Sequence, residues 1–165
     1  EGAERRFERG ERLAAQGGRS HRAGLVVQGA FRYLHADAAG GEHVVGYAFA
    51  GEFVGDYISM CVDSPSHVTI EAMCGAAALV VTGGRLEAFY RTDAAHERLG
   101  RTMAEHMLAE VYERLLERYA ASPQQRYEAL LERCPDLLQM VSLRELASYL
   151  GVRPETLSRI RGRIR

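Results

Sequence analysis

The uneven distribution of glycine limits the possible folds most strongly, because it divides the chain into two parts with different backbones. Of the 17 Gly, 14 lie in residues 1–84. Many of them are spaced roughly ten residues apart, as turns between short strands are. The runs between these glycines favour strands: Leu25–Val27, Phe31–Leu34, Val44–Phe49, Val68–Ile70 and Leu79–Thr82. Residues 10–82 are therefore predicted to form a small antiparallel barrel or jelly roll.

After Gly84 the apolar residues follow a helical period. Between Asp93 and Ala120 there is no Pro, and Gly100 is the only Gly, so a single long helix is predicted. A seam at Ala104, Leu108, Val111 and Leu115 advances by four, three and four residues, as in a coiled coil. A second apolar stripe runs beside this seam through Tyr112, Leu116 and Tyr119.

Two apolar stripes need two surfaces to cover them. We expect one face of the helix to pack on the barrel and the other on a second copy of the chain. A single wide core face remains the alternative. The residues expected at the dimer interface are Met103, Ala104, Met107, Leu108, Val111 and Leu115.

The region from 121 to 140 predicts two short helical segments. Ser122 is expected to cap a helix in which Pro123 is the first residue and which ends near Arg133. A shorter segment is predicted over Asp136–Met140, after Pro135.

Residues 141–165 contain the most specific pattern. Ser142 and Glu145 have the spacing of a capping box before a helix over Leu143–Leu150, and Gly151 is suited to end it. Pro154 can begin the next helix, whose predicted buried stripe is Leu157, Ile160 and Ile164. Two short helices joined by a tight glycine turn indicate a helix-turn-helix. The alternative is an ordinary helical hairpin with a solvated basic face.

The charge distribution supports a polyanion as the partner of this C-terminal region. Residues 1–140 contain 15 Arg and 20 Asp and Glu, whereas residues 141–165 contain six Arg and two Glu. All 21 basic residues are Arg. The absence of Lys excludes P-loop, Schiff-base and kinase-type lysine chemistry.

Cysteine content and hydropathy indicate a cytoplasmic protein. Cys61, Cys74 and Cys134 are an odd number without short spacing, which argues against a disulfide scaffold, a zinc knuckle or an iron–sulfur cluster. No apolar run approaches the roughly 20 residues of a membrane span. No basic-then-apolar leader opens the chain, so export and a membrane partner are not expected.

The segment Val141–Ile160 resembles the DNA-binding motif of the cAMP receptor protein/fumarate–nitrate regulator (Crp/Fnr) family. Gly51-Glu-Phe-Val-Gly-Asp-Tyr is similar to the start of that family's phosphate-binding cassette, and the helix over 93–120 matches its dimerisation helix. The resemblance implies an α+β fold with an N-terminal antiparallel β jelly roll like that of cyclic-nucleotide-binding domains. A long dimerisation helix and a C-terminal helix-turn-helix domain would follow.

The expected domains are a β-barrel sensor over 1–92, the dimerisation helix over 93–120 and the DNA-binding domain over 121–165. The chain stops at Arg165, before the wing that the family carries.

The same resemblance implies a homodimeric, bacterial transcription regulator. Its partners would be double-stranded DNA with an inverted-repeat operator, RNA polymerase and a small-molecule effector of unknown identity. Family positions place Pro154, Glu155 and Arg159 at the bases, with Ser142 and Arg144 at phosphates. The full set of expected DNA-binding residues is Ser142, Arg144, Arg153, Glu155, Thr156, Ser158, Arg159 and Arg163.

The expected effector pocket differs from that of the family's cyclic AMP binders. Asp56 stands in place of a Glu, and Ser66-His67 in place of an Arg-Ser pair whose Arg holds the cyclic phosphate. A buried phosphate would lose that charge-assisted bond and face the Asp56 carboxylate, so the effector is predicted not to be cyclic AMP. The pocket residues are expected to be Gly51, Gly55, Asp56, Ser66, His67, Val111 and Tyr112.

Two other functions are alternatives to a ligand-controlled regulator. One is a constitutive DNA-binding dimer with a vestigial pocket, and the other is a metal enzyme of the cupin class on a similar jelly roll. Cupin sites require clustered His and Glu, but His21, His35, His43 and His67 are never two residues apart. No enzymatic activity and no cofactor or metal is therefore expected.

Overall fold

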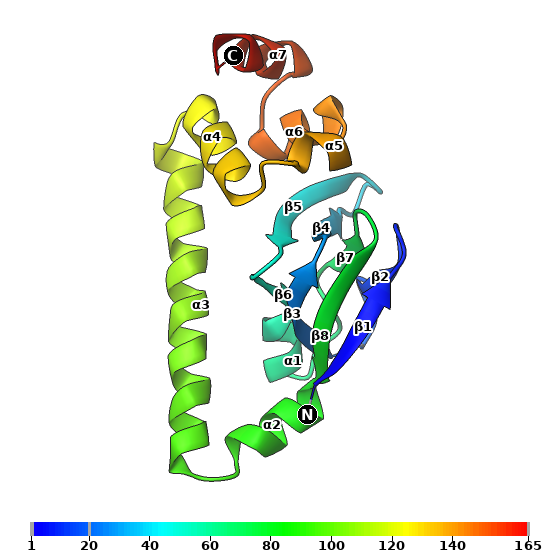
Figure 1. The fold of residues 1–165 in the computed structure, drawn as a ribbon, viewed down its shortest axis with the longest axis vertical. Helices are drawn as coiled ribbons and strands as arrows, with labels where there is room; N and C mark the ends of the chain where they lie inside the picture. The colour runs from blue at the N-terminus through cyan, green and yellow to red at the C-terminus, as the bar shows by residue number, and fades with distance from the viewer. Residues whose placement is uncertain (1, 20, 165) are drawn as a thin grey trace.

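The computed structural model describes residues 2–19 and 21–164, without the side chain of Ile164. Its N-terminal half is the predicted antiparallel jelly roll, made of two four-stranded sheets with the orders β1-β8-β3-β6 and β2-β7-β4-β5 (Figure 1). The strands are β1 (Ala3–Phe7), β2 (Arg12–Ala14), β3 (Arg22–Gln28), β4 (Ala30–Ala36), β5 (Glu42–Phe49), β6 (Phe53–Gly55), β7 (Thr69–Ala72) and β8 (Ala76–Thr82).

Alternating residues fill the space between the two sheets. Phe31 on β4 is fully buried and meets the Phe7 ring edge-on at 5.1 Å, while Ile70 on β7 is also fully buried. The turn from β3 to β4 depends on Gly29, which has φ +80° and a Cβ position only 2.7 Å from the carbonyl oxygen of Gly75. This close approach brings the β3–β4 turn against the β7–β8 turn.

All five predicted strand runs correspond to strands, but three strands were not predicted. β1 has the sequence AERRF, in which only Phe7 is buried, and β2 and β6 have three residues each. Two helices were also missed. These are α1 (Tyr57–Cys61), of one turn, and α2 (Gly83–Tyr90), which begins with two glycines that favour turns over helices.

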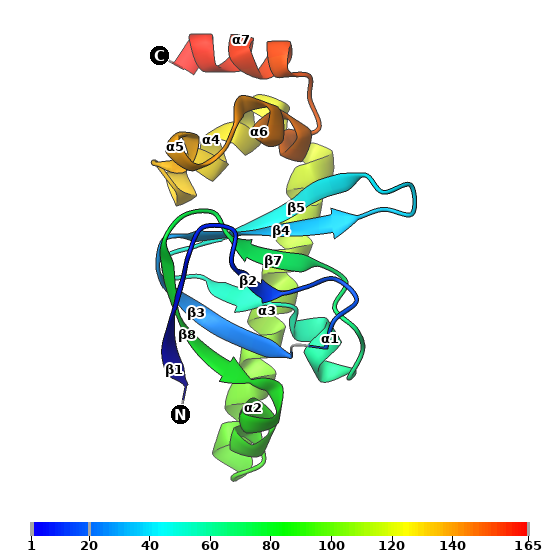
Figure 2. The ribbon, with the colours of Figure 1, turned by 90° about the vertical axis from the view of Figure 1, so that its right-hand side faces the viewer.

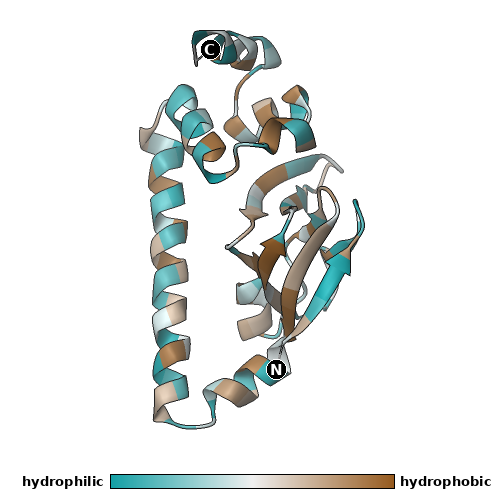
Figure 3. Cartoon of the chain, viewed as in Figure 1, coloured by the Kyte–Doolittle hydropathy of each residue, from teal (hydrophilic) through white to brown (hydrophobic). Residues whose placement is uncertain are grey.

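The predicted long helix is α3 (Ala94–Ala120), which begins at Asp93, whose carboxylate accepts from the backbone N–H groups of Ala95 and His96. The expected packing of one face on the barrel is largely wrong. Only Gly100 is buried, where it lies against the Tyr90 ring of α2, and every residue from 109 to 120 is exposed. Apolar bands are visible along the helix in Figure 3. The single wide core face is not observed either.

The C-terminal helices α4 (Pro123–Arg133), α5 (Leu137–Met140), α6 (Leu143–Leu150) and α7 (Pro154–Ile164) lie above the barrel, with α7 farthest from it (Figure 2). Their core continues into the barrel. Tyr127, Leu137, Leu146 and Leu157 form one buried cluster with Tyr47 and other residues of β5 and its neighbours. None of the described helices is long and apolar enough to cross a membrane.

Candidate DNA interface and effector pocket

The helix-turn-helix is built by the residues that the sequence singled out. Ser142 Oγ accepts from the Glu145 backbone N–H at 3.1 Å and begins α6. Gly151 has φ 67°, the left-handed conformation that ends the helix. The backbone N–H groups of Thr156 and Leu157 donate to the Arg153 carbonyl oxygen and so form the first turn of α7.

The second helix presents one polar face. Leu157 is fully buried and Ile160 nearly so, as predicted, whereas the predicted position of the Ile164 side chain lies outside the described residues. All eight expected DNA-binding residues are exposed: Ser142, Arg144, Arg153, Glu155, Thr156, Ser158, Arg159 and Arg163. Their side chains therefore lie where an approaching ligand can reach them.

The capping box predicted at Ser142 is only half formed. Ser142 caps α6, but the Glu145 side chain accepts from Arg32 at 2.8 Å instead of reaching back to the backbone. The complete capping box is at Ser122, where Gln125 supplies the reciprocal bond. An ionic partner on the barrel thus takes Glu145 away from its predicted role.

Arg32 on β4 joins the barrel to α6. Its Nη2 lies 2.6 Å from Glu71 of β7, and its Nη1 lies 2.8 Å from Glu145. Burial opposes the charged form of Arg32, but the bonds to Glu71 and the charge of Glu145 raise its pKa. The Tyr47 hydroxyl donates to Glu145 at 3.5 Å, and burial followed by the Glu145 charge raises the Tyr47 pKa.

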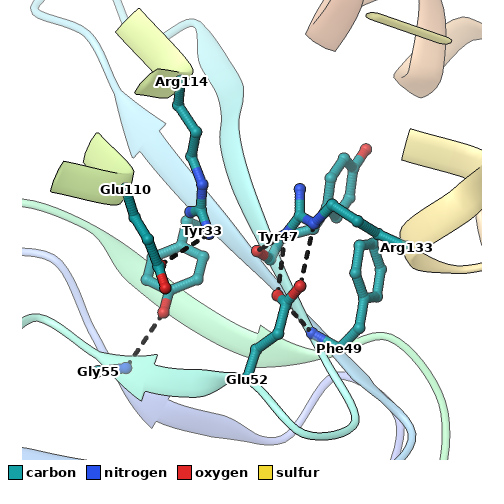
Figure 4. A network of polar contacts seen from close by, with 8 residues as sticks. All are labelled: Tyr33, Tyr47, Phe49, Glu52, Gly55, Glu110, Arg114 and Arg133. Atoms are coloured by element: carbon teal, nitrogen blue, oxygen red, sulfur yellow. Dashed lines mark hydrogen bonds and ion pairs between the residues drawn. The ribbon is translucent and has the colours of Figure 1, made fainter. Parts of the chain in front are cut away.

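Arg133 at the end of α4 makes the opposite connection, from the C-terminal helices to the barrel (Figure 4). Its Nε and Nη2 bind the two carboxylate oxygens of Glu52 at 2.9 and 2.8 Å, and its guanidinium lies 5.1 Å from the centre of the Phe49 ring. Such bidentate pairs fix geometry as well as adding energy. The barrel and the C-terminal helices are therefore held together by two ion pairs, one with its Arg on the barrel and one with its Arg on α4.

In the expected effector pocket, the Asp56 carboxylate is hydrogen-bonded to groups of the protein itself. Its carboxylate accepts from Ser59 Oγ at 2.7 Å, Ser66 Oγ at 2.9 Å and the His67 backbone N–H at 2.8 Å, and it caps α1 through the Ser59 N–H. Burial raises the pKa of Asp56, but these hydrogen bonds outweigh it and lower the pKa below the usual value.

Other expected pocket residues are less closely grouped. The Gly55 N–H donates to the Tyr33 hydroxyl at 3.1 Å, in a part of the barrel that faces Arg114 of α3 (Figure 4). Gly51 lies in the β5–β6 turn, where its N–H donates to Val26. Val111 and Tyr112 are 61% and 59% exposed on α3, so they do not line an enclosed pocket in the single chain.

The model of the cyclic nucleotide-binding domain family matches residues 4–93. The chain belongs to this family. The Crp/Fnr resemblance found in the sequence is confirmed by this match together with the complete arrangement of barrel, long helix and C-terminal helices. No curated protein sequence matches the chain.

Solved structures with the same fold cover nearly the whole chain. FixK2 from Bradyrhizobium japonicum has a TM-score of 0.78 and 20% identity, covering 99% of this chain and 84% of its own. The c-di-GMP responsive global regulator CLP from Xanthomonas campestris has a TM-score of 0.66 and 18% identity, and the match covers 99% of this chain and 86% of CLP. The catabolite activator protein of Thermus thermophilus has a TM-score of 0.56 and 22% identity, and the match covers 99% of this chain and 78% of that protein.

The contacts that hold this family member's domains together were not found from the sequence. A partial indication was available for Arg32, since it is the only Arg between Arg22 and Arg85 and lies within a predicted strand. Nothing in the pattern indicates that Glu52 and Arg133 pair, because they are 81 residues apart and lie in different regions.

A metal site is not supported by the side-chain arrangement. Within residues 2–19 and 21–163, whose side chains are described, no group of three or more His, Cys, Asp and Glu could hold a metal ion. Cys61 is exposed, Cys74 half-buried and Cys134 buried, and all three are free thiols. His67 is exposed in the bend before β7, and only its backbone N–H takes part in the Asp56 cluster.

We predict that Asp56→Asn destabilises the fold by about 1–3 kcal/mol at neutral pH, because an amide cannot accept all the bonds of a carboxylate. Since the folded state lowers the Asp56 pKa, its stabilisation is complete above the unfolded value of 3.8 and is lost as the pH falls through the lowered one. Urea unfolding between pH 3 and pH 7 (on the order of four pH units of titration) should show a shallower acid limb in the variant. Asp63→Asn, which changes a nearby exposed carboxylate, is the control and should leave the stability at neutral pH almost unchanged. Equal effects of the two variants would contradict a structural role for Asp56.

Proposed function

We propose that this Crp/Fnr family member is a homodimeric, sequence-specific DNA-binding transcription regulator. It acts in the cytoplasm by binding and not by catalysis. RNA polymerase and the operator DNA are its macromolecular partners. We also propose a three-part division into a sensor over 1–92, a dimerisation helix over 93–120 and a DNA-binding domain over 121–165, which the bounds of α3 and α4 support.

The observation that carries the proposal is the exposed polar face of α7. A helix of 11 residues follows the Gly151 turn, buries Leu157 and Ile160, and exposes Glu155 and Arg159. Glu can accept from cytosine N4, and Arg can donate twice to guanine O6 and N7. A recognition helix of this kind reads base edges in the major groove while its partner helix contacts the backbone.

Dimerisation is supported by the exposed apolar stripe of α3. Leu108 is 69% exposed, Val111 61% and Leu115 49%, all on the predicted seam. An apolar stripe of this length on a soluble surface indicates an interface, and a coiled-coil spacing indicates a second helix as its partner. The second copy then provides the second recognition helix.

The barrel is proposed to sense an effector other than cyclic AMP. No Arg is available in the cassette to pair with a cyclic phosphate, and the Asp56 carboxylate is directed inward to Ser59 and Ser66. The related regulator CLP is described as responsive to c-di-GMP, so this fold accommodates other effectors. A distinct small molecule is therefore consistent with the same barrel.

The second candidate is a constitutive dimer with a vestigial pocket. It is favoured by the hydrogen bonds of the cassette, because the Asp56 carboxylate and the Gly55 N–H are both bonded within the chain. The two candidates differ only in whether a small molecule changes DNA binding.

The DNA-binding assignment predicts opposite effects for two arginines. Arg159→Ala should cost about 1–3 kcal/mol per contact and relax the preference at one base pair in each half-site. Arg144→Ala should weaken binding to all sequences alike and reduce the salt slope by about one unit for each lost phosphate contact. Selection from randomised duplexes with both variants measures the two effects together. If Arg159→Ala left the selected motif unchanged and Arg144→Ala altered it, the orientation proposed for α7 on DNA would be wrong.

The dimer assignment predicts that Leu108→Asp runs as a monomer in light scattering and loses operator binding. A carboxylate buried in an apolar seam costs several kcal/mol, whereas the exposed position tolerates it in the single chain. His106→Asp, also exposed but on the opposite side of α3, is the matched control and should remain dimeric. A monomeric wild type at micromolar concentration would rule the interface out.

The pocket assignment predicts no saturable heat when cyclic AMP is titrated to ~1 mM, a range in which even ligands with millimolar Kd are detected. A clear isotherm in the micromolar range would instead mean that another donor replaces the missing Arg. Mass spectrometry of small molecules that co-purify with the protein separates the two candidates. A stoichiometric ligand that changes operator affinity supports the sensor, and unchanged affinity after its removal supports the constitutive dimer.

A further inference from the structure

The Arg126 side chain lies between the ends of two helices that belong to different parts of the fold. Arg126 is in α4, and its Nη2 donates to the carbonyl oxygen of Leu150, the last residue of α6, at 2.8 Å. Its Nη1 lies 3.5 Å from the carbonyl oxygen of Arg118 in the last turn of α3, at the long limit of a hydrogen bond. Leu150 directly precedes the Gly151 turn of the helix-turn-helix.

Both carbonyls belong to groups that a helix cannot satisfy by itself. The last four carbonyls of a helix have no partner within it and carry partial negative charge. At the end of α6, the Ala147 and Ser148 carbonyls accept from the backbone N–H groups of Val152 and Gly151. The Leu150 carbonyl is left for a side chain, and Arg126 supplies the donor.

The remaining nitrogen of the Arg126 guanidinium, Nε, gives no other reason for the position of this side chain. Nε is buried and has no hydrogen-bond partner among the described residues. A buried donor without a partner costs free energy, so the surroundings of Nε do not account for the position of this half-buried side chain. The position of the guanidinium is instead explained by its contacts with the Leu150 and Arg118 carbonyl oxygens.

We propose that Arg126 is a positioning residue that sets the angle between α3 and the helix-turn-helix and so determines which half-site spacing the dimer accepts. This inference rests on the proposed function, because it takes α3 as the dimer axis and α7 as the recognition helix. In a dimer about this axis, the junction at Arg126 occurs twice, once on each side. The separation and relative rotation of the two recognition helices therefore depend on the stiffness of this junction.

The required precision follows from DNA geometry. Recognition helices of a dimer enter successive major grooves about 34 Å apart. One inserted base pair moves a half-site by about 3.4 Å along the axis and rotates it by about a tenth of a turn. A rigid junction cannot follow this change, whereas a looser one can.

The first experiment measures binding to the selected operator with its half-sites moved apart or together by one base pair. We expect the wild type to lose about tenfold in affinity for each such change, and Arg126→Gln to lose less than about threefold. Arg126→Lys keeps the charge but not the forked donors, and should give an intermediate penalty. Arg91→Gln removes an exposed Arg that lies outside α3 and pairs with Glu87 of α2, and should behave as the wild type.

A loss of affinity that is equal at all spacings in Arg126→Gln would overturn the proposal, since it would indicate destabilisation alone. Thermal unfolding of each variant is measured alongside. If Arg126→Gln does not fold, the spacing penalty of Arg126→Lys decides the question.

The second experiment needs no DNA and therefore separates this inference from the proposed function. Spin labels at Arg98→Cys on α3 and Gly162→Cys on α7, both exposed, report their separation by pulsed electron resonance. Cys61→Ser and Cys74→Ser remove the accessible thiols, and excess unlabelled chain removes distances between subunits. We expect a narrow distribution in the wild type and a distinctly broader one in Arg126→Gln. Equal widths would refute the positioning role even if the protein binds its operator as proposed, and a broader distribution would support it even if no operator is found.

Discussion

The arrangement of the molecule depends on the Arg32 guanidinium, which binds a carboxylate of the barrel and a carboxylate of α6 at the same time. Glu71 lies 2.6 Å from it and Glu145 2.8 Å, and the side chains of the two carboxylates are only 11% and 16% exposed. Partly buried charges are costly unless each is paired, so removing one member leaves the others uncompensated. The first helix of the helix-turn-helix is thus held where the barrel places Arg32.

The position of α7 depends on the Arg32–Glu145 contact, because α7 packs on α6. Leu146 of α6 and Leu157 of α7 belong to one buried cluster with Tyr47 and Phe49 of β5. The Arg133–Glu52 pair closes the same junction from the side of α4. A change in the conformation of β5 would therefore move α6 and α7 together, which connects the barrel directly to the surface proposed to bind DNA.

Local patterns predicted the elements of this fold, and long-range pairing explains what they did not predict. Glycine spacing and helical period suffice for β3, β4 and β5 and for α3, because these signals lie within ten or so residues. β1 could not be found, since its register is set by β8, to which Ala3 and Phe7 pair across more than 60 residues. Glu145 had the right spacing for a capping box, but Arg32, 113 residues away, competes successfully for its carboxylate. Asp56 was predicted to lie in the cassette, but its bonding to Ser66 and His67 depends on how the loop closes.

The absence of Lys, which in the sequence only excluded certain enzymes, has a structural meaning at these junctions. Arg32 serves two carboxylates, Arg133 binds Glu52 with two nitrogens while lying over Phe49, and Arg126 reaches two helix ends. Each of these arrangements uses the planar, multiple donors of a guanidinium, and an ammonium group offers only a compact charge on a flexible stem. A Lys at position 32 would lack the forked donors with which Arg32 binds Glu71 and Glu145 through separate nitrogens. The three arginines therefore connect the barrel, α3, α4 and α6, because each of them joins two elements and not merely one.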